Sequence, residues 1–495
     1  MEGTEPARIR LGVRRTFWMT ASATAVLACT LLVVAPQVLA QNRTRDSDRA
    51  VAILRDVFNF VRQNYVNAAA AGTDRLLEGA LTGMLEAVDD PYTTFVDRDE
   101  IDELNDMTTG EFGGVGLYLS RADDGVLVIE PFVGSPAHAA GIKAGDLIVA
   151  IDDTEAGTLD EEGVVSRLRG SPGTDVRVSL VRAGVETVEV TVTRQLIEVP
   201  TVRHAVIEPG IGYLRVSPQF TSKTPDRIRE ALRDLERRSG SLILDLRGNR
   251  GGLFSAVVEI ADLFLDAGTI VQTRSRVASE NQQYTATRRA TLVDRDTPIV
   301  VLIDSLSASA AEILAGALKD HERAYLVGQQ SYGKGSVQQV MRIEDDRAVK
   351  VTTSRYLTPD GTRIDGVGVT PHRITEPKLS EDQQEALGEF GRSKLLIRFA
   401  LAHPEPTEAD IGRLLVDLGQ SEFDLEEQLV RRKLAQTIAR IHRRTPIYDL
   451  INDASLIEAV RLLRTGEVSA DSFPDDAQPK VPDSAADLPL GGWSG

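Results

Sequence analysis

Ser309 and Lys334 are the two residues whose types and spacing best suit covalent chemistry. Ser309 follows the apolar run Pro298–Asp304 and precedes a helical pattern, so we expect its hydroxyl at the N-terminus of a helix that packs on a sheet. Backbone amides and a partial positive charge at such an end can stabilise a developing oxyanion. Ser309 and Glu312 also form the pattern of a capping box, and this structural alternative stays open for the segment alone.

Lys334 lies 25 residues after Ser309 and is flanked by Gly333 and Gly335. Glycine neighbours allow a lysine to turn inward where bulkier residues would clash. Burial disfavours the ammonium and lowers the pKa of the amine, and a neutral amine can take the proton of a serine hydroxyl. Gln338 shares a face with Lys334 in an extended strand, where its amide can orient the amine. A solvated lysine in a turn is the alternative interpretation.

Other nucleophiles and metal sites have little support in the sequence. The single cysteine, Cys29, lies in an apolar segment, which excludes a disulfide framework and cysteine zinc sites. The six histidines stand in no triad motif and no metal-ligand spacing. The segment Gly328–Lys334 matches the P-loop pattern, but Gly335 replaces the magnesium-binding Ser or Thr, and the residues after it read as a strand. We therefore expect no metal and no organic cofactor.

Length and composition indicate several globular domains. The chain has 495 residues, of which 42% are hydrophobic and 26% charged, so about two to four domains with sizeable cores are expected. Its 74 acidic and 56 basic residues give a net charge of −18. This balance argues against a nucleic-acid partner, because phosphate contacts need a basic face.

Residues 1–40 have the pattern of an export signal. Four arginines precede the uncharged segment Thr16–Ala40, which ends in Val38-Leu39-Ala40 and so fits the small-residue cleavage rule. These arginines are Arg8, Arg10, Arg14 and Arg15. We expect a periplasmic or cell-envelope protein. The same segment is apolar enough to span a bilayer, so an uncleaved inner-membrane anchor stays open as the alternative.

The rest of the chain divides by its hydrophobic patterns. Residues 41–111 repeat apolar positions at three- and four-residue steps, which predicts helices, and residues 112–194 read as short strands punctuated by glycines. Residues 195–378 alternate strands with helices, and near-continuous apolar runs within them predict strands buried on both faces. Residues 379–467 are again helical, whereas the tail 468–495 is rich in Pro, Asp, Ser and Gly and is expected to be disordered.

A peptide-binding module is indicated around Gly113. Closely spaced glycines precede a strand there; their amides can form a nest for a carboxylate, and the strand edge can pair with an extended peptide. Together with the later segments Gly134–Ala137 and Ala140–Ile148, the stretch resembles a PDZ domain. The resemblance implies that a free C-terminus is received by Gly113, Gly114, Val115, Gly116 and Leu117. Arg169, after the second helix of the domain, can sense the charge of that end, with an ordinary surface arginine as the alternative.

The motifs, taken in order, resemble the carboxy-terminal processing proteases of peptidase family S41. The resemblance covers about residues 50–375. Besides the PDZ motifs it rests on four segments: Thr108–Gly114, Leu244–Gly252, Ser307–Glu312 and Gly333–Gln338. It implies a multidomain α+β protein in which the PDZ domain is inserted before a ClpP/crotonase-like α/β protease core, between helical N- and C-terminal regions.

The resemblance also implies roles for individual residues. Ser309 would be the nucleophile, Lys334 the general base and Gln338 its orienting partner. The amides of Ala310 and Gly252, or Gly251 in its place, would form the oxyanion hole. The sequence departs from the family pattern at four positions, which concern the substrate groove rather than the dyad: Gly248, Arg250, Ala311 and His372.

We therefore predict an exported serine endopeptidase that cleaves envelope proteins near their C-termini, acting on protein or peptide substrates with a free C-terminus. A catalytically silent PDZ adaptor that delivers substrates to another protease is the alternative from a different class. A homo-oligomer and an activating or adaptor partner stay open, since the helical regions at both ends can serve assembly as well as core packing.

Overall fold

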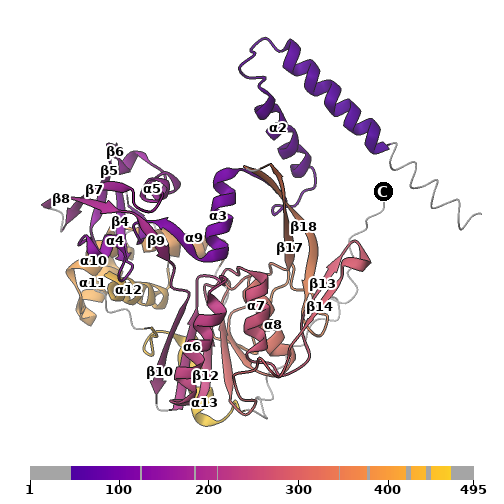
Figure 1. Ribbon diagram of the computed structural model, residues 1–495. Coiled ribbons are helices and arrows are strands. Elements are labelled where there is room, and N and C mark those ends of the chain that lie inside the picture. Colours follow the sequence, from indigo (N-terminus) through magenta and orange to yellow (C-terminus); the bar gives the residue numbers. More distant parts are fainter. Residues whose placement is uncertain are drawn as a thin grey trace, which may run out of the picture. The chain divides into compact units, whose positions relative to one another are not determined.

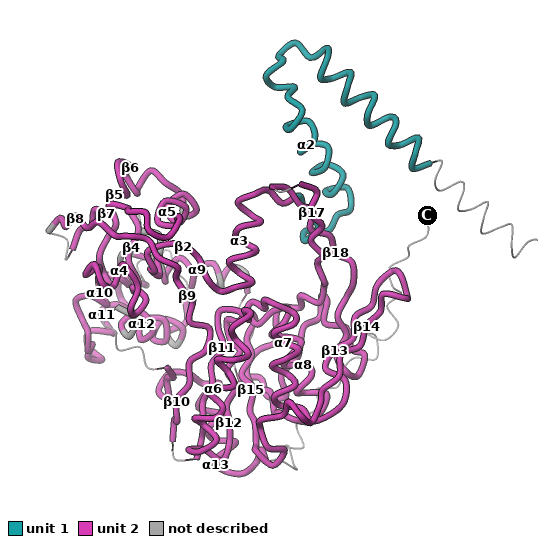
Figure 2. Tube along the Cα trace, in the orientation of Figure 1, with its two compact units in different colours: residues 1–95 teal, residues 96–495 magenta. Residues whose placement is uncertain are grey.

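A computed structural model describes residues 46–122, 125–182, 186–208, 210–344, 346–375, 380–419, 425–441 and 447–469. Figure 2 shows its two compact units, residues 1–95 and residues 96–495. The predicted export signal and nearly all of the predicted tail lie outside the described residues. Within the described ranges, no helix is long and apolar enough to cross a membrane.

The described part of the first unit is helical, as predicted. A helix over residues 46–64 is followed by α2 (Thr73–Glu86), and strand β1 (Thr94–Val96) lies at the boundary of the two units in the sequence. The apolar positions that predict the first helix are only partly buried, since Leu54, Val57 and Tyr65 are exposed. The periodicity therefore predicted the element but not its burial.

A PDZ-like domain opens the second unit after α3 (Arg98–Thr109). Its sheet has the strand order β3-β4-β5-β7-β8, and β6 pairs with β5. The strands are β3 (Leu117–Ala122), β4 (Gly125–Pro131), β5 (Leu147–Ile151), β6 (Thr154–Glu155), β7 (Asp175–Arg182) and β8 (Glu186–Thr193). The short helices are α4 (Pro136–Ala139), η1 (Ala156–Thr158) and α5 (Glu161–Leu168). Strands β2 (Glu111–Gly114) and β9 (Gln195–Glu198) pair where the chain enters and leaves the domain.

The next domain is built on a mainly parallel sheet with the order β10-β11-β12-β15-β16-β19. Strand β10 runs antiparallel to β11, and the other pairs are parallel. The strands are β10 (Val202–Glu208), β11 (Gly210–Val216), β12 (Ser239–Asp245), β15 (Ile299–Ile303), β16 (Tyr325–Gly328) and β19 (Arg373–Ile374). Every residue of β15 is buried, as expected for a strand covered on both faces.

Helices cover both faces of this sheet (Figure 1). One face packs on α6 (Thr224–Glu236), α7 (Phe254–Asp262) and α8 (Ala310–Asp320). The other face packs on α13 (Ala454–Thr465), which comes from the far end of the chain. Successive residues of β12 point to opposite sides, so that Leu244 faces the first layer and Ile243 faces α13. The result is a three-layer α/β core that α13 completes.

A second, antiparallel sheet carries the strand that follows Lys334. Strands β17, β18, β13 and β14 pair in that order. Their bounds are β17 (Ser336–Glu344), β18 (Arg347–Leu357), β13 (Thr269–Ser275) and β14 (Gln282–Thr285), with the short helix η2 (Ala278–Glu280) between the last two. The β17–β18 hairpin therefore holds the lysine segment at one side of the core.

The helical C-terminal region has two separate attachments. Helices α9 to α12 form one apolar cluster with strand β4 of the PDZ-like domain, through Leu127 and Ile129. These helices are α9 (Glu381–Arg392), α10 (Lys394–Ala402), α11 (Glu408–Gly419) and α12 (Glu427–Ile441). Strand β4 is buried on both sides as a result, since Val126 and Val128 face the interior of its own domain. Helix α13 instead belongs to the three-layer core.

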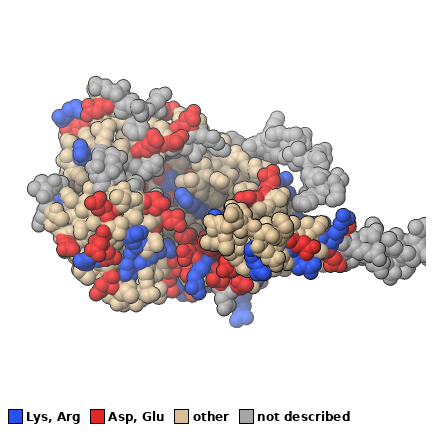
Figure 3. All heavy atoms as spheres, turned by 90° about the horizontal axis from the view of Figure 1, so that it is seen from above, with Lys and Arg blue, Asp and Glu red and all other residues tan. Residues whose placement is uncertain are grey.

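Charged side chains of both signs lie interspersed over the face shown in Figure 3. Charged residues also form exposed ion pairs, such as Arg229 with Asp226 within α6 and Arg227 of α6 with Glu198 of β9. Exposed pairs of this kind contribute at most about 1 kcal/mol each, so the fold depends on its apolar clusters.

Candidate active site

Ser309 lies at the junction between β15 and α8, where sequence analysis placed it. It has φ 55° and ψ −115°, in the left-handed half of conformational space. Such a conformation costs a non-glycine residue on the order of 1–3 kcal/mol and persists only where the surroundings hold it. The preceding loop is held by Ser307, whose Oγ donates to the Leu246 carbonyl at 2.9 Å.

Glu312 supplies the support for Ser309 and also reaches the lysine segment. Its carboxylate is fully buried and accepts four hydrogen bonds. One oxygen, Oε2, accepts from the backbone N–H of Ser309 at 2.7 Å and from that of Lys334 at 2.8 Å. The other oxygen accepts from the Gly333 N–H and the Ser331 hydroxyl, each at 2.6 Å. The bond to the Ser309 amide is the one that a capping box predicts, but the other three bonds reach across to another loop.

The shared oxygen limits the distance between the two predicted catalytic residues. Because the nitrogens of Ser309 and Lys334 lie 2.7 and 2.8 Å from one atom, they can be no more than the sum, 5.5 Å, apart. A lysine side chain and a serine side chain can meet easily across such a gap. The fold therefore brings these two residues together at the level of the backbone.

The glycines beside Lys334 are required by close packing. A Cβ at Gly335 would lie 2.2 Å from the Asp365 nitrogen, and one at Gly333, where φ is 93°, would lie 3.1 Å from the Gly368 nitrogen. No side chain fits in either place without displacing backbone. These contacts explain the two glycines, and Lys334 itself is half-buried. An inward turn of its side chain stays a prediction.

The surroundings of Lys334 lower the pKa of its amine. Burial lowers the pKa of its amine, and the positive charge of Lys350 on β18 lowers it further. Burial also raises the pKa of Glu312, against the hydrogen bonds from Ser331, Gly333, Ser309 and Lys334, which lower it. The site therefore combines an amine that loses its proton more readily than usual with a carboxylate that is held by four donors.

Gln338 lies on β17, two residues after the strand begins. Its amide nitrogen donates to the hydroxyls of Ser336 at 2.8 Å and of Thr352 at 3.3 Å. With the NH2 group engaged in this way, the carbonyl oxygen is the part of the amide that can accept a hydrogen bond from an ammonium. The orienting role of Gln338 stays a prediction.

The glycine loop after β12 lies directly against Ser309. A Cβ at Gly251 would be 2.8 Å from the Ser309 Cβ and 3.2 Å from the Ala310 nitrogen. The Gly251 amide already donates to the Asn249 side chain at 2.9 Å. Among the hydrogen bonds of the described residues, none has the amide of Gly252 or Ala310 as its donor. These two amides thus suit an oxyanion better than that of Gly251, and the choice between Gly252 and Gly251 favours Gly252.

Comparison with known proteins decides the family. The model of peptidase family S41 matches residues 210–375, which include Ser309, Lys334 and the glycine loop. A carboxy-terminal-processing protease of Bartonella bacilliformis is 34% identical over 451 residues, which are 90% of this chain and 95% of the relative. The chain belongs to peptidase family S41. The predicted family and the predicted class, a serine-type endopeptidase, are confirmed at this level.

Further relatives and domain models match parts of the chain. The carboxyl-terminal-processing protease of Synechocystis is 35% identical over 384 residues, 74% of this chain and 88% of the relative. A solved structure described as a photosystem II D1 C-terminal processing protease is 30% identical and covers 66% of this chain and 93% of its own, with a TM-score of 0.41. A PDZ domain model matches residues 113–193, and the model of the activating protease CtpB N-terminal domain matches residues 17–100. The predicted fold, a PDZ domain before an S41 core with helical regions at both ends, is confirmed.

The predicted peptide-binding loop, Gly113 to Leu117, is only partly a loop in the structure. Gly113 and Gly114 end β2 and pair with β9, and Leu117 begins β3, so Val115 and Gly116 form the turn between them. Gly116 has φ 79°, and its carbonyl accepts from the Ser135 hydroxyl and the Phe132 amide, each at 3.0 Å. The Val115 carbonyl accepts from the Ala137 amide at 2.9 Å. With these carbonyls held on the domain, β3 follows as an edge strand of the PDZ sheet. An edge strand beside an amide-rich loop is the geometry on which an extended peptide can pair.

Arg169 has a partner within the chain in this structure. Its guanidinium donates to the Asp106 carboxylate on α3 at 2.8 Å and lies 4.9 Å from the centre of the Phe112 ring. Phe112 directly precedes the peptide-binding loop, so Arg169 lies near the loop but with its charge already paired. Its predicted contact with a peptide end therefore requires that it leave or share Asp106.

His372, one of the departures from the family pattern, is held in the fold by a hydrogen bond and a ring contact. Its Nδ1 accepts from the Leu326 amide at 2.9 Å, and its ring stacks on Tyr325 with 4.8 Å between the centres. Burial, with the charge of Lys319 adding to it, lowers the pKa of His372 to about 4. The ring is therefore neutral at ordinary pH. In the described part of the chain, no group of three or more acidic, histidine or cysteine residues could hold a metal ion.

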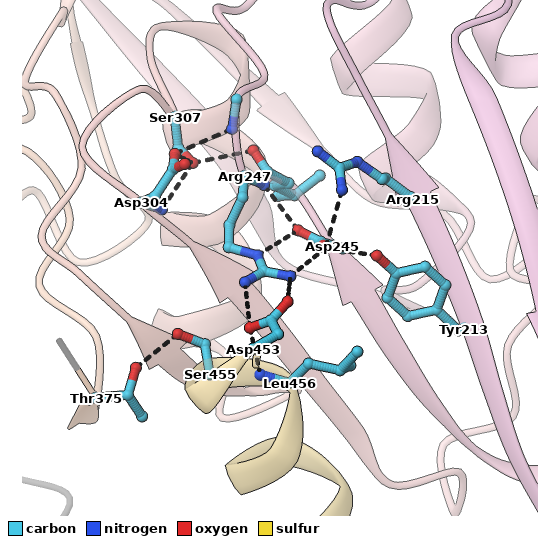
Figure 4. A network of polar contacts seen from close by, with 12 residues as sticks. Tyr213, Arg215, Asp245, Arg247, Asp304, Ser307, Thr375, Asp453, Ser455 and Leu456 are labelled. Atoms are coloured by element: carbon cyan, nitrogen blue, oxygen red, sulfur yellow. Dashed lines mark hydrogen bonds and ion pairs between the residues drawn. The ribbon is translucent and has the colours of Figure 1, made fainter. Parts of the chain in front are cut away.

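Figure 4 shows a polar network around Arg247. Asp245, the last residue of β12, forms a salt bridge with Arg247, with the closest contact at 2.7 Å. Burial works to raise the pKa of Asp245, but Arg247, Arg215 and the Tyr213 hydroxyl together outweigh it, and the pKa is lowered to about 2. The guanidinium of Arg247 also donates two bonds of 2.7 Å to Asp453, which no motif indicated.

Proposed function

We propose that this S41 peptidase is exported and cleaves proteins of the cell envelope near their C-termini, with Ser309 and Lys334 as a catalytic dyad. The observation that carries the proposal concerns the Glu312 carboxylate. One of its oxygens accepts hydrogen bonds from the backbone amides of both residues. A capping role for Ser309 and Glu312 alone gives no reason for the three further bonds to the lysine segment. The lowered pKa of Lys334 supports its role as a base.

In the proposed mechanism, peptide cleavage proceeds by acyl transfer. The Ser309 hydroxyl attacks the scissile carbonyl while its proton passes to the neutral amine of Lys334. The amides of Ala310 and Gly252 stabilise the oxyanion, and Lys334 returns the proton to the leaving amine as the C–N bond breaks. Water then attacks the Ser309 ester, gives its proton to Lys334 and releases the new carboxylate, and Ser309 recovers the proton. Apart from this water, every group in the sequence belongs to the chain or the substrate.

Binding of the substrate end is assigned to the PDZ domain. We infer that a free C-terminal carboxylate binds the amides of Gly113 to Leu117 while the residues before it pair with the edge of β3. Arg169 lies near enough to the start of this loop to exchange Asp106 for the charge of the peptide end. This step would place the substrate chain beside the dyad at a position upstream of its C-terminus.

The cellular location is proposed from the sequence alone. The arginines before Thr16–Ala40 and the small residues at its end favour export with cleavage, and the retained anchor is the alternative. A homo-oligomer and an activating partner remain predictions. Fractionation of cells that express the full chain, followed by N-terminal sequencing, distinguishes a cleaved signal from an anchor.

Cleavage of an unfolded envelope protein tests the proposed chemistry. The full chain and its Ser309→Ala and Lys334→Ala variants are incubated with the same substrate, and the products are identified by mass spectrometry. We expect fragments with cuts near the C-terminus from the full chain and no cleavage by either variant, although both variants fold. Near-normal turnover by Lys334→Ala would show that the dyad is wrong. Absence of cleavage by the full chain, with substrate still bound, would favour the PDZ adaptor.

A matched pair of substrates tests the PDZ assignment. One peptide carries a free C-terminus and the other has the same sequence with a C-terminal amide. Because the amide removes the charge that the loop is proposed to bind, we expect weaker binding of the second peptide. Equal binding of the two would refute carboxylate capture and leave the dyad untouched.

A further inference from the structure

We propose that Asp453, at the start of the C-terminal helix α13, is a positioning residue for the oxyanion hole and acts through Arg247. Helix α13 lies outside the S41 match of residues 210–375. The inference rests on the proposed function, because it requires that the amide of Gly252 stabilise an oxyanion. It assigns the end of the chain a part in catalysis.

The contact between Asp453 and Arg247 is bidentate and largely shielded from solvent. The two terminal guanidinium nitrogens each donate to one Asp453 oxygen at 2.7 Å, and the side chains are only 16% and 17% exposed. The same guanidinium donates to both oxygens of Asp245, at 2.9 and 2.7 Å. Arg247 therefore lies between two carboxylates, one from β12 and one from α13 (Figure 4). Planar, paired bonds of this kind fix orientation as well as position.

The carboxylate of Asp453 is itself held by the fold. It caps α13 by accepting the Leu456 amide at 3.0 Å. The helix is anchored by apolar residues such as Leu456 and Val460, which pack against the sheet face that contains Ile243. The position of Asp453 thus depends on the packing of α13 and not on the active-site loop. Asp453 can therefore fix the position of the Arg247 guanidinium from outside the glycine loop.

The position of Arg247 in turn constrains the loop that faces Ser309. It directly precedes Gly248, whose amide donates to the Asp304 carboxylate at 3.0 Å. The backbone carbonyl of the next residue, Asn249, accepts a hydrogen bond from the Ala308 amide at 2.9 Å. The loop then reaches Gly251, which lies against the Ser309 Cβ. The glycine loop and the serine loop are therefore bonded together, and Arg247 is the point at which the first of them is fixed to the C-terminal helix.

We expect an effect on catalysis because an oxyanion hole tolerates little displacement of its hydrogen-bond donors. Its donors act only if they are already in place when charge develops, and a displacement of about 1 Å can cost on the order of 100-fold in rate. Without Asp453, Arg247 keeps its bonds to Asp245 but loses the contact that fixes its outer edge. The loop that follows keeps its bonds to Asp304 and Ala308 but loses its fixed link to α13, and we expect the amide of Gly252 to be held less firmly.

The test compares two variants of the same helix. Asp453→Asn keeps the helix cap and the size of the side chain but removes the charge that binds Arg247. Glu458→Gln is the matched control: Glu458 also lies on α13 and pairs with Arg373 of β19 at 3.2 Å, at the far edge of the sheet from the glycine loop. Both are made in the full chain. Turnover of a protein substrate is measured below the melting temperatures of both variants, together with amide exchange of residues 246–253 in a Ser309→Ala background.

We expect Asp453→Asn to lower kcat by about 10-fold or more with KM changed less than about twofold, as for a loosened oxyanion donor. Amide exchange of residues 246–253 should become faster. Glu458→Gln should change neither quantity. Equal behaviour of the two variants in kcat or in exchange would overturn the inference. Undiminished cleavage by Ser309→Ala would overturn the proposed function instead, and the exchange measurement separates the two cases because it does not depend on cleavage.

Discussion

Ser309 and Lys334 donate their backbone N–H groups to the same oxygen of the Glu312 carboxylate, at 2.7 and 2.8 Å. The two residues belong to different loops, one before α8 and one before β17. A single buried side chain therefore sets the spacing of the proposed dyad and also supports the left-handed backbone of the nucleophile. Ser309 and Glu312 match a helix-capping motif in the sequence, but in the fold Glu312 also holds the segment of Lys334 beside Ser309.

Replacement of Glu312 by glutamine should disrupt the site. The substitution keeps the size of the side chain but turns an amide NH2 toward donors that need an acceptor. Loss of such buried hydrogen bonds costs about 2–4 kcal/mol in the free energy of unfolding, and kcat should fall by on the order of 100-fold. Denaturant unfolding and turnover measure both effects. Glu322→Gln, at an exposed position two residues beyond the end of α8, is the control and should change neither. Wild-type turnover in Glu312→Gln would contradict a positioning role.

The pH dependence of cleavage should follow the amine of Lys334. The base must be neutral, so kcat/KM rises with pH as Lys334 loses its proton, with a midpoint below the ordinary lysine value of 10.5 because burial and Lys350 lower the pKa. Lys350→Gln removes a positive charge that disfavours the ammonium. We expect this substitution to move the rising part of the kcat/KM profile to higher pH and to leave its plateau at high pH unchanged.

Two further variants make the pH result specific. Arg342→Gln removes one positive charge from the exposed part of the same hairpin and should leave the limb where it is. Lys334→Arg stays charged throughout the accessible range and should be inactive at every pH. If the limb of Lys350→Gln coincides with that of the unchanged protein, the titrating group is not Lys334.

Gly251 should not tolerate a side chain. In Gly251→Ala the new Cβ would lie 2.8 Å from the Ser309 Cβ, and the backbone has φ 105°. The control is Gly361→Ala, which has φ 84° but open space around the new Cβ. We expect the control to lose about 1 kcal/mol in the free energy of unfolding, from backbone strain alone, and to keep its activity. Gly251→Ala should lose more stability and on the order of 100-fold in kcat; similar turnover in the two variants would contradict the contact with Ser309.

His372 should make the fold sensitive to acid. Its pKa is lowered from an ordinary 6.5 to about 4 in the folded state, so the unfolded chain takes up a proton first as the pH falls. The stability that the neutral ring contributes is therefore present above about pH 6.5 and lost as the pH approaches 4. His372→Asn keeps an acceptor for the Leu326 amide and cannot titrate. Its free energy of unfolding should fall less steeply over this range, and identical slopes for the two proteins would contradict the assignment.

The amino-acid sequence alone determined the features that depend on short stretches of chain. The buried strand before Ser309, the glycines around Lys334, the PDZ loop and the helical ends are each set by local patterns of hydrophobicity and turn chemistry. Such patterns act over a few residues, which is why a PDZ domain before an S41 core could be predicted, while the dyad of Ser309 and Lys334 stays a proposal. The same local reading placed residues 379–467 in one helical region.

Only the tertiary structure decided which of these elements meet. An amphipathic helix fits any apolar face of the right size, so nothing local could assign α9 to α12 to the PDZ strand β4 and α13 to the core sheet. Glu312 matched a helix cap, and its bonds to the lysine segment needed a second loop to arrive beside it. Arg247 and Asp453 are 206 residues apart, and their contact exists because α13 packs on the core sheet. Contacts of that range follow from the packing of the whole chain and not from any one segment of it.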